Sequence, residues 1–349
     1  MTFGRKKKTA TLGLIVLVAS AFINKYLFLS LVALYALGIL ALAVFMAANK
    51  AVKKTNWWIN KFAFTHQFVS NAGYRKNLIR NYEVANVGSN PARFAFFYED
   101  VLGQNWSSGT QGLDMDLEVL RFNHSYLKKG APVILPIVAF SSVSGFLTKV
   151  SRPYMAKFVS ILDGLQINYN DKLREGRKYL KYPLLYDWKA VRHLFFDTEL
   201  DRRLDINEQP MQLIEMEQDA QEWMKIWKDE FRISDVSAPL PDHLKEGREK
   251  SVKMMIDMVN FLKERGYKPV IVSPPMSASL MKHFTKDVRD TYIYSFVDEI
   301  KKRVDVPYMD YMDSEFQNNK YYFNALFMNL RGRKMFTKRV LTDLSLIKN

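Results

Sequence analysis

One nearly unbroken apolar run, residues 9–49, constrains this chain more than any other feature of its sequence. It contains a single charged residue, Lys25. A helix needs about 20 residues to cross the hydrocarbon core of a bilayer, so the run is about twice the length of one span. A break at Lys25 predicts two transmembrane helices, at 9–24 and 27–48. A cleaved signal peptide is the alternative for the first, but a second apolar run follows at once without a clear small-residue cleavage site.

The charges that flank this membrane anchor, residues 1–54, leave its orientation open. RKKK precedes the first span and KAVKK follows the second, and such clusters favour the cytoplasmic side. A two-helix hairpin satisfies both clusters, whereas a single spanning helix places the main domain outside. Residues 55–81 are predicted to be a juxtamembrane linker. Within it, Trp57 and Trp58 either anchor the chain at the membrane interface or pack against the globular domain.

Charge and composition exclude several classes of function. Of the formal charge of +15, more than half belongs to the anchor, which carries eight basic residues and no acidic one. The mild excess elsewhere does not indicate a nucleic-acid-binding face; an anionic envelope polymer or a lipid headgroup is a better partner. The chain has no cysteine, which excludes disulfides and thiolate sites. It also lacks HExxH and Walker motifs, so we predict neither a metal nor a cofactor.

The rest of the chain alternates strand and helix patterns from residue 82 to 345. Short apolar runs that end in polar or turn residues predict buried strands at 82–87, 132–138, 268–273 and 306–310. Helical spacing predicts helices at 113–128, 243–265 and 287–303, the first two of which stop at a glycine. This alternation predicts an α/β fold whose parallel sheet is covered by helices on both faces. Residues 145–240 interrupt it and are predicted to form a mostly helical insertion that caps or lines a cleft.

Two short motifs supply candidate site residues. The sequence NVGSNP, residues 86–91, places Ser89 after a strand and before a helix start, where it either serves as a nucleophile or caps the helix with Pro91 in the first turn. The sequence GQNWSSGTQG follows from residue 103. Asn105 comes after an expected short strand, and Gly109 allows a tight loop. An amide side chain and a glycine N–H are suitable oxyanion donors, although an ordinary connecting loop explains the pattern equally well.

The order of these elements resembles the SGNH (GDSL-like) hydrolase superfamily. More narrowly, it resembles the membrane-anchored branch found beside polysaccharide and teichoic-acid acylation systems. The resemblance covers about 82–140 and 243–345. It implies a flavodoxin-like sheet, Ser89 as the nucleophile, and Asn105 and Gly109 as oxyanion donors.

The closing block of the family departs from its pattern in this chain. The family carries an Asp-His pair, then Leu-Asn and a glycine, and here FNALFMNLRGRKMFT provides Asn329 and Gly332. Leu326 and Phe327, however, stand at the positions of the acid and the base. A serine hydroxyl needs a base, and that base needs an orienting acid. Among the five histidines, we consider only His193 able to reach the cleft as a substitute.

Two functional classes follow from these observations. The first, which we favour, is a catalytically impaired, membrane-anchored SGNH-like accessory protein of cell-envelope or exopolysaccharide synthesis or acylation. Its partners would be the lipid bilayer, a membrane synthase or acyltransferase, and an anionic or acylated polysaccharide. The second is an active serine esterase or O-acyltransferase that uses Ser89 with a base from elsewhere. Both place the protein in the cell membrane, and the family resemblance favours an extracytoplasmic domain where the flanking lysines favour a cytoplasmic one.

Overall fold

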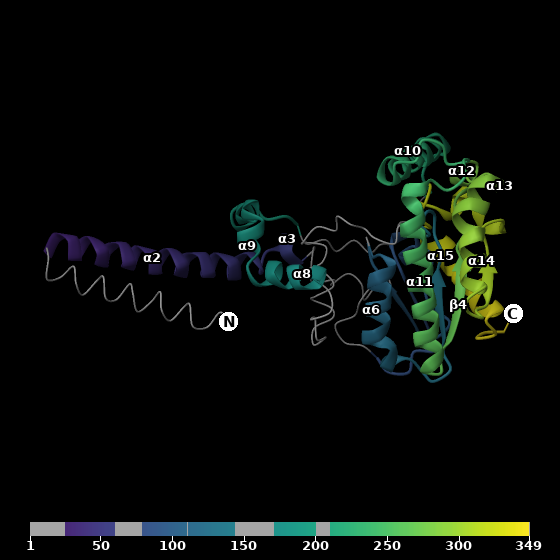
Figure 1. Cartoon of the computed structure of the whole chain (residues 1–349), viewed down its shortest axis with the longest axis horizontal. Helices are drawn as coiled ribbons and strands as arrows, with labels where there is room; N and C mark the ends of the chain where they lie inside the picture. Colours follow the sequence, from purple (N-terminus) through teal and green to yellow (C-terminus); the bar gives the residue numbers. More distant parts are fainter. Residues whose placement is uncertain (1–24, 60–78, 110, 144–170, 200–209, 349) are drawn as a thin grey trace. The chain divides into compact units, whose positions relative to one another are not determined.

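A computed structural model describes residues 25–59, 79–109, 111–143, 171–199 and 210–348 (Figure 1). These residues belong to two compact units. The first contains the described part of Met1–Ile59 together with Lys181–Glu199, and the second contains the described parts of Asn60–Leu180 and Leu200–Asn349. The segment 181–199, which the sequence places inside the insertion of the α/β domain, is thus part of the N-terminal unit.

A single long helix dominates the first unit. Helix α2 runs over Lys25–Val52, and its apolar side chains are almost all exposed. It has the length and composition of a membrane-spanning helix, properties that a signal sequence near an N-terminus shares. The second predicted span, 27–48, is therefore confirmed as one continuous helix. The first, 9–24, lies outside the described residues, and so does the predicted hairpin.

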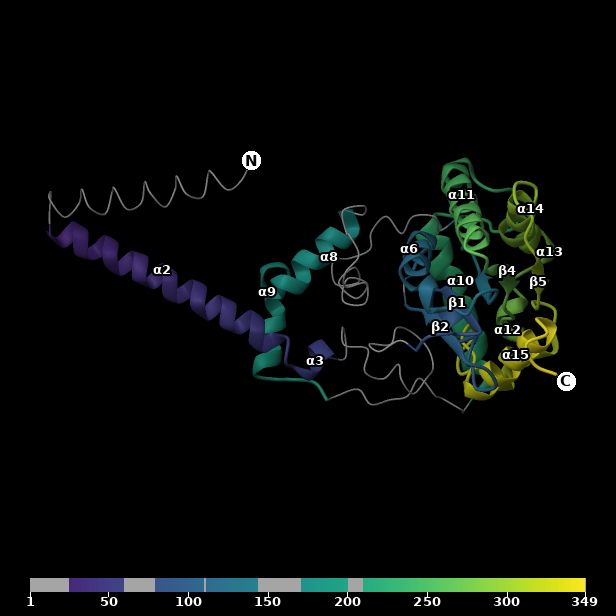
Figure 2. The same cartoon turned by 90° about the horizontal axis from the view of Figure 1, so that it is seen from below.

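The C-terminal end of α2 packs against the 181–199 segment, as Figure 2 shows for α9. The short helix α3 (Asn56–Trp58) follows α2, and the segment adds helix α9 (Pro183–Tyr186) and a 3-10 helix, η4 (Trp188–Leu194). Trp58 is buried, and the ring of Trp57 stacks on that of His193 with centroids 4.7 Å apart. The tryptophans thus pack within the N-terminal unit, where Trp57 contacts the 181–199 segment, and an interfacial anchoring role stays a prediction.

The second unit is built on a five-stranded parallel sheet. Its strand order is β2-β1-β3-β4-β5, and its strands are β1 (Val84–Gly88), β2 (Gly103–Ser107), β3 (Pro132–Pro136), β4 (Lys268–Ser273) and β5 (Tyr308–Asp310). The predicted strand 268–273 matches β4 residue for residue. Asn105 lies in the middle of β2 rather than after it.

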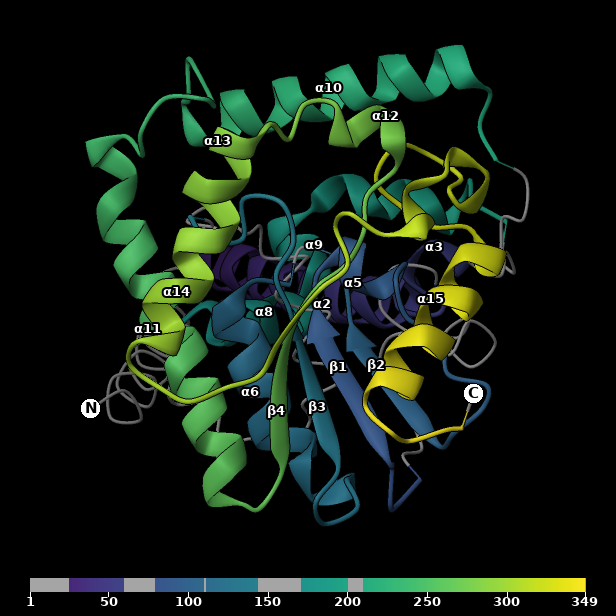
Figure 3. The same cartoon turned by 90° about the vertical axis from the view of Figure 1, so that its right-hand side faces the viewer.

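Helices cover both faces of this sheet. The main ones are α6 (Leu113–Asn123), α11 (Asp242–Glu264), α14 (Ser295–Lys301) and α15 (Leu330–Asp343), whereas α10 (Leu213–Phe231) lies across the carboxyl ends of the strands (Figure 3). Helix α11 packs against α6 and α14, and α15 lies on the opposite side of the strands from α6 (Figure 3). Shorter elements are α5 (Asn90–Arg93), η2 (His124–Tyr126), α12 (Ala278–Met281), α13 (Lys286–Arg289), the π-helical turn η5 (Asp290–Tyr294), η6 (Glu315–Gln317) and η7 (Asn319–Tyr321). Helix α8 (Asp171–Lys181) precedes the 181–199 segment in the chain.

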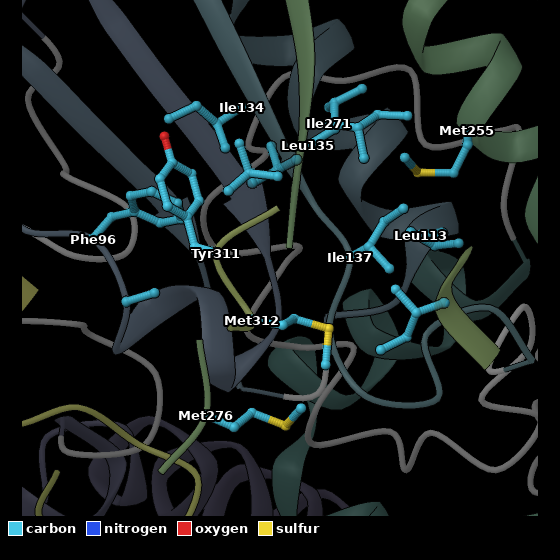
Figure 4. Packing of buried hydrophobic residues seen from close by; sticks show 14 of the residues in the cluster. Phe96, Leu113, Ile134, Leu135, Ile137, Met255, Ile271, Met276, Tyr311 and Met312 are labelled. Atoms are coloured by element: carbon cyan, nitrogen blue, oxygen red, sulfur yellow. The ribbon is translucent and has the colours of Figure 1, made fainter. Parts of the chain in front are cut away.

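The core follows from this two-sided cover. Every residue of β1, β2 and β3 is buried, as expected for parallel strands with helices on both faces. Ile134 and Ile271 of neighbouring strands pack with Leu113 and Met255 of the helices in one cluster (Figure 4). This packing fixes the strand ends, and with them the loops that carry the candidate site.

Candidate functional site

A cleft of about 250 Å³ opens at the carboxyl ends of the central strands. Strand β1 pairs with β2 on one side and with β3 on the other, so the chain's direction of winding reverses between β1 and β3. Ligands of open parallel sheets bind at this reversal. The walls come from the ends of β1 and β3, helix α5, the N-terminus of α6, helix α10 and the loop before α15; their residues include Ser89, Asn90, Gln111, Gly112, Asp116, Ser141, Trp223, Trp227, Glu230, Phe231, Leu326 and Phe327.

Ser89 lies in this cleft at the turn from β1 into α5. The turn requires Gly88, whose φ is +126° and on which a Cβ would lie 2.7 Å from the Ala92 Cβ. Ser89 occupies the N-cap position of α5, but its side chain makes no capping hydrogen bond. Within the described residues, no partner activates its half-buried hydroxyl. The capping role that the sequence allowed is therefore not used.

Asn105 does not line the cleft. Its side chain is fully buried, and its amide nitrogen donates to the carbonyl oxygens of Arg93 and Phe96, at 3.1 and 3.0 Å. Its amide oxygen accepts from Asn86 Nδ2 at 2.8 Å and from the Ser107 N–H at 3.1 Å. These bonds tie α5 and the chain after it to the sheet. Asn105 thus supports the Ser89 turn from within the sheet, and both N–H groups of its amide are used in these bonds.

Gly109 lies behind Asn90 rather than on the cleft surface. A Cβ on Gly109 would lie 3.0 Å from the Asn90 side-chain oxygen, so glycine leaves room for that side chain. The backbone on the cleft surface is instead that of Gly112, the N-cap of α6, with its neighbours Gln111 and Leu113. The N-terminus of α6, which is the positive end of its dipole, therefore lies at this surface, and such an end suits a negative or polarised oxygen.

Two carboxyl groups line the cleft, and the sequence analysis proposed neither. Asp116 of α6 is buried and accepts a 2.6 Å hydrogen bond from Gln111 Nε2. Burial raises its pKa to about 8, although the bonds from Gln111 and the Gly88 N–H oppose the shift. Glu230 of α10 is partly desolvated, and burial raises its pKa as well. Of the described residues that line the cleft, none is a histidine.

Leu326 and Phe327 form one wall of the same cleft. Both backbone N–H groups donate to the Asn324 side-chain oxygen, at 3.0 and 2.7 Å. The Phe327 ring packs on Phe94 and Trp223, with centroids 4.9 and 5.7 Å apart. The positions at which the resemblance implies an acid and a base are thus near Ser89 in space, but they present apolar side chains.

Asn329 and Gly332 fit the family pattern and have a structural role here. The Asn329 side chain caps α15 by accepting from the Gly332 N–H at 2.9 Å, and it donates to the Lys320 carbonyl at 2.8 Å. Gly332 packs directly against the backbone of Tyr321, which leaves no room for a Cβ. Together they fix the start of α15 and the loop that carries Leu326 and Phe327.

No histidine of the described residues lines the cleft. His193 stacks on Trp57 within the N-terminal unit. Nearby Asp197 accepts hydrogen bonds from the Asn56 and Trp57 N–H groups, at 2.6 and 3.0 Å, and so caps α3. His124, for its part, contacts Phe261 edge to face. His243 and His283 are absent from the cleft lining, and His66 lies outside the described residues.

Helix α10 belongs to the insertion that the sequence predicts to cap or line a cleft, and it does line this one, although the sequence analysis named none of its residues. Trp223, Trp227 and Phe231 recur every four residues on this helix and line the cleft. That spacing was visible in the sequence, but it is equally typical of a helix that packs on a core. No protein-family model matches this chain, and no curated protein matches it.

Proposed function

We propose that this chain is a membrane-anchored, SGNH-like accessory protein whose cleft binds a ligand without hydrolysing it. The ligand class that fits is an acylated or anionic cell-envelope polysaccharide, presented together with a membrane synthase or acyltransferase. The observation that carries the proposal is the meeting of Ser89 and Phe327 in one cleft. They occupy the positions that the resemblance gives to the nucleophile and its base, and the position of the base holds a phenyl ring that cannot accept a proton.

The fold and the cleft lining support this assignment. The strand order β2-β1-β3-β4-β5 is that of flavodoxin-like sheets. The cleft combines aromatic walls with a few polar groups, as ligand sites do, but its 250 Å³ is less than the roughly 300–1,000 Å³ typical of such sites. It therefore suits one sugar ring or a short acyl group, whose apolar face would pack on Trp223 and Trp227.

Glu230 favours a second candidate function, an active serine esterase or O-acyltransferase. Glu230 lines the cleft that contains Ser89, and although the residue keeps an exposed part, partial burial raises the pKa of its carboxyl. A carboxylate with a raised pKa can act as a general base. In this reaction, Glu230 would take the Ser89 proton while the N-terminus of α6 stabilises the oxyanion.

Covalent labelling of the purified full chain with a serine-reactive fluorophosphonate tests the first proposal. We expect no labelling of the wild type, because no described residue forms a hydrogen bond that would activate the Ser89 hydroxyl. The double variant Leu326→Asp with Phe327→His should become labelled at Ser89, and adding Ser89→Ala should abolish that labelling. Ser141→Ala is the matched control, since Ser141 is a second serine of the cleft.

Two results would contradict this reading. Labelling of wild-type Ser89 would show an activated hydroxyl, and its loss in Glu230→Gln would identify the base and support the second function. A folded double variant that remains unlabelled would show that the cleft lacks the geometry of an SGNH site, which would remove the basis of both functions.

A further inference from the structure

The foot of α2 extends beyond the part of the helix that a bilayer core can hold. Its 28 residues span about 42 Å at 1.5 Å per residue, whereas the hydrocarbon core is about 30 Å thick. With the apolar part of α2 in the core, its last two turns reach the headgroup region. These turns contain Asn49, which is buried against the 181–199 segment, and Lys50.

The 181–199 segment is firmly attached to this foot. The Asn49 side-chain oxygen accepts from the Leu184 N–H at 3.0 Å, and Lys53 Nζ donates to the Lys181 carbonyl at 3.2 Å. Asp197 at the far end of the segment caps α3, as described above. We call residues 49–59 and 181–199 together the foot module. It forms one unit with the helix, so its surface is held at a fixed place beside α2.

The foot module exposes large apolar side chains that its own packing does not use. Leu185 is 63% exposed, Trp188 71%, Phe195 76% and Phe196 80%. Bulky side chains exposed as a group are unusual on a protein surface that faces only water. Other side chains of the same segment, Ala190 among them, are buried, so these four large apolar side chains are not exposed merely because the segment lacks packing of its own.

The charges of the foot module suit one kind of surface. It contains six basic residues and three acidic ones, and one of the acidic residues, Asp197, is occupied as a helix cap. Aromatic side chains and lysines or arginines are the residues that gather where a protein meets the headgroups of a bilayer, and anionic lipids attract basic segments.

We infer that the foot module is a membrane-interface anchor, in which Leu185, Trp188, Phe195 and Phe196 insert into the headgroup region of the leaflet that α2 leaves. This role is independent of the cleft and its ligand. It assigns part of the central insertion to the lipid surface, and it means that the chain meets the bilayer through a surface as well as a helix.

Site-specific fluorescence tests the inference, because the chain has no cysteine of its own. Single variants Trp188→Cys and Phe196→Cys in the otherwise unchanged full chain are labelled with an NBD fluorophore. They are reconstituted into vesicles of phosphatidylcholine and phosphatidylglycerol. Leu37→Cys, in the middle of α2, reports whether the helix is in the bilayer, and Met335→Cys on α15 is the matched control, an exposed apolar residue of the other unit.

We expect blue-shifted emission and strong quenching by lipids that carry a spin label near the headgroup for the two foot-module positions. Leu37→Cys should be quenched by lipids labelled deep in the acyl chain, and Met335→Cys should remain in water. If Leu37→Cys is quenched while both foot-module positions remain in water, the inference is wrong. Blue-shifted emission without quenching by lipid would also overturn it, since protein would then cover the surface. An unquenched Leu37→Cys would remove its premise.

Discussion

Replacing Asp116 with asparagine should change how the stability of the second unit depends on pH. Folding buries the Asp116 carboxyl beside the Ser89 turn and raises its pKa from 3.8 to about 8. The folded protein therefore binds this proton more tightly than the unfolded chain does. The stability that this proton binding contributes is complete below pH 4 and is lost progressively as the pH rises to 8. Asparagine has nearly the same shape and does not titrate.

The size of the effect follows from the shift. Each pH unit between the two pKa values changes the free energy of unfolding by about 1.4 kcal/mol, so the difference between variant and wild type should grow by about 3 kcal/mol from pH 5 to pH 7. The variant also places an amide NH₂ near the Gly88 N–H, a mismatch that costs about 1–2 kcal/mol at every pH. The prediction therefore concerns how the difference in the free energy of unfolding changes with pH, and it makes no claim about the size of that difference at any one pH.

Urea unfolding of the full chain in a non-ionic detergent, followed by tryptophan fluorescence at pH 5, 6 and 7, measures this slope. Asp257→Asn is the matched control, because Asp257 is an exposed aspartate on α11. Parallel curves for Asp116→Asn and the wild type would refute the reasoning. They would show that Asp116 is ionised in the folded protein and held by its two N–H donors.

Three further substitutions test the supports of the site and of the foot module. Asn105→Ala should lower the free energy of unfolding by about 2–4 kcal/mol, because it strips buried carbonyls of their donor; a stable variant would mean that water replaces the amide. Gly332→Ala should cost about 1–3 kcal/mol by collision with the Tyr321 backbone, and a wild-type melting temperature would contradict it. Asn49→Leu should speed hydrogen exchange of the Leu184 amide by about tenfold, since that N–H loses its acceptor; unchanged exchange would show that the segment does not depend on this bond.

The sheet was largely predictable because buried parallel strands are short apolar runs. Strand β4 is such a run, KPVIVS, and the sequence gives its bounds without error. Strand β2 is different, since GQNWS is polar although every residue of it is buried. The Asn105 amide is satisfied by the Asn86 side chain and by the backbone of α5 and the chain after it, partners that no local pattern reveals. Because its sequence is polar, β2 does not match the pattern of a buried strand, and Asn105 was therefore expected in a loop.

Only the part of the candidate site that lies at the strand ends was predictable from the sequence. Ser89 follows a strand, and in a parallel sheet that position fixes the edge at which it lies. Trp223 and Glu230 are more than 130 residues from Ser89 in the chain, and their helix has a spacing that any packed helix shows. The division of the insertion was equally hidden, because 181–199 carries aromatic and charged residues whether it meets a cleft or the foot of α2.

The apolar pair at 326–327 packs closely against its neighbours. This packing bears on whether the cleft works without a base or uses one from another position. Phe327 packs on Phe94 and Trp223, and Leu326 is almost fully buried. An aspartate at 326 would be buried with only the new histidine to compensate its charge, at a cost of a few kcal/mol. The double substitution should therefore lower stability while it creates reactivity, and labelling has to be scored per folded molecule. A wall that stabilises the fold through Phe327 favours a cleft kept for binding. If Glu230 is the base of an active enzyme, the same wall needs only to exclude water. The Glu230→Gln labelling experiment separates the binding function from the enzymatic one.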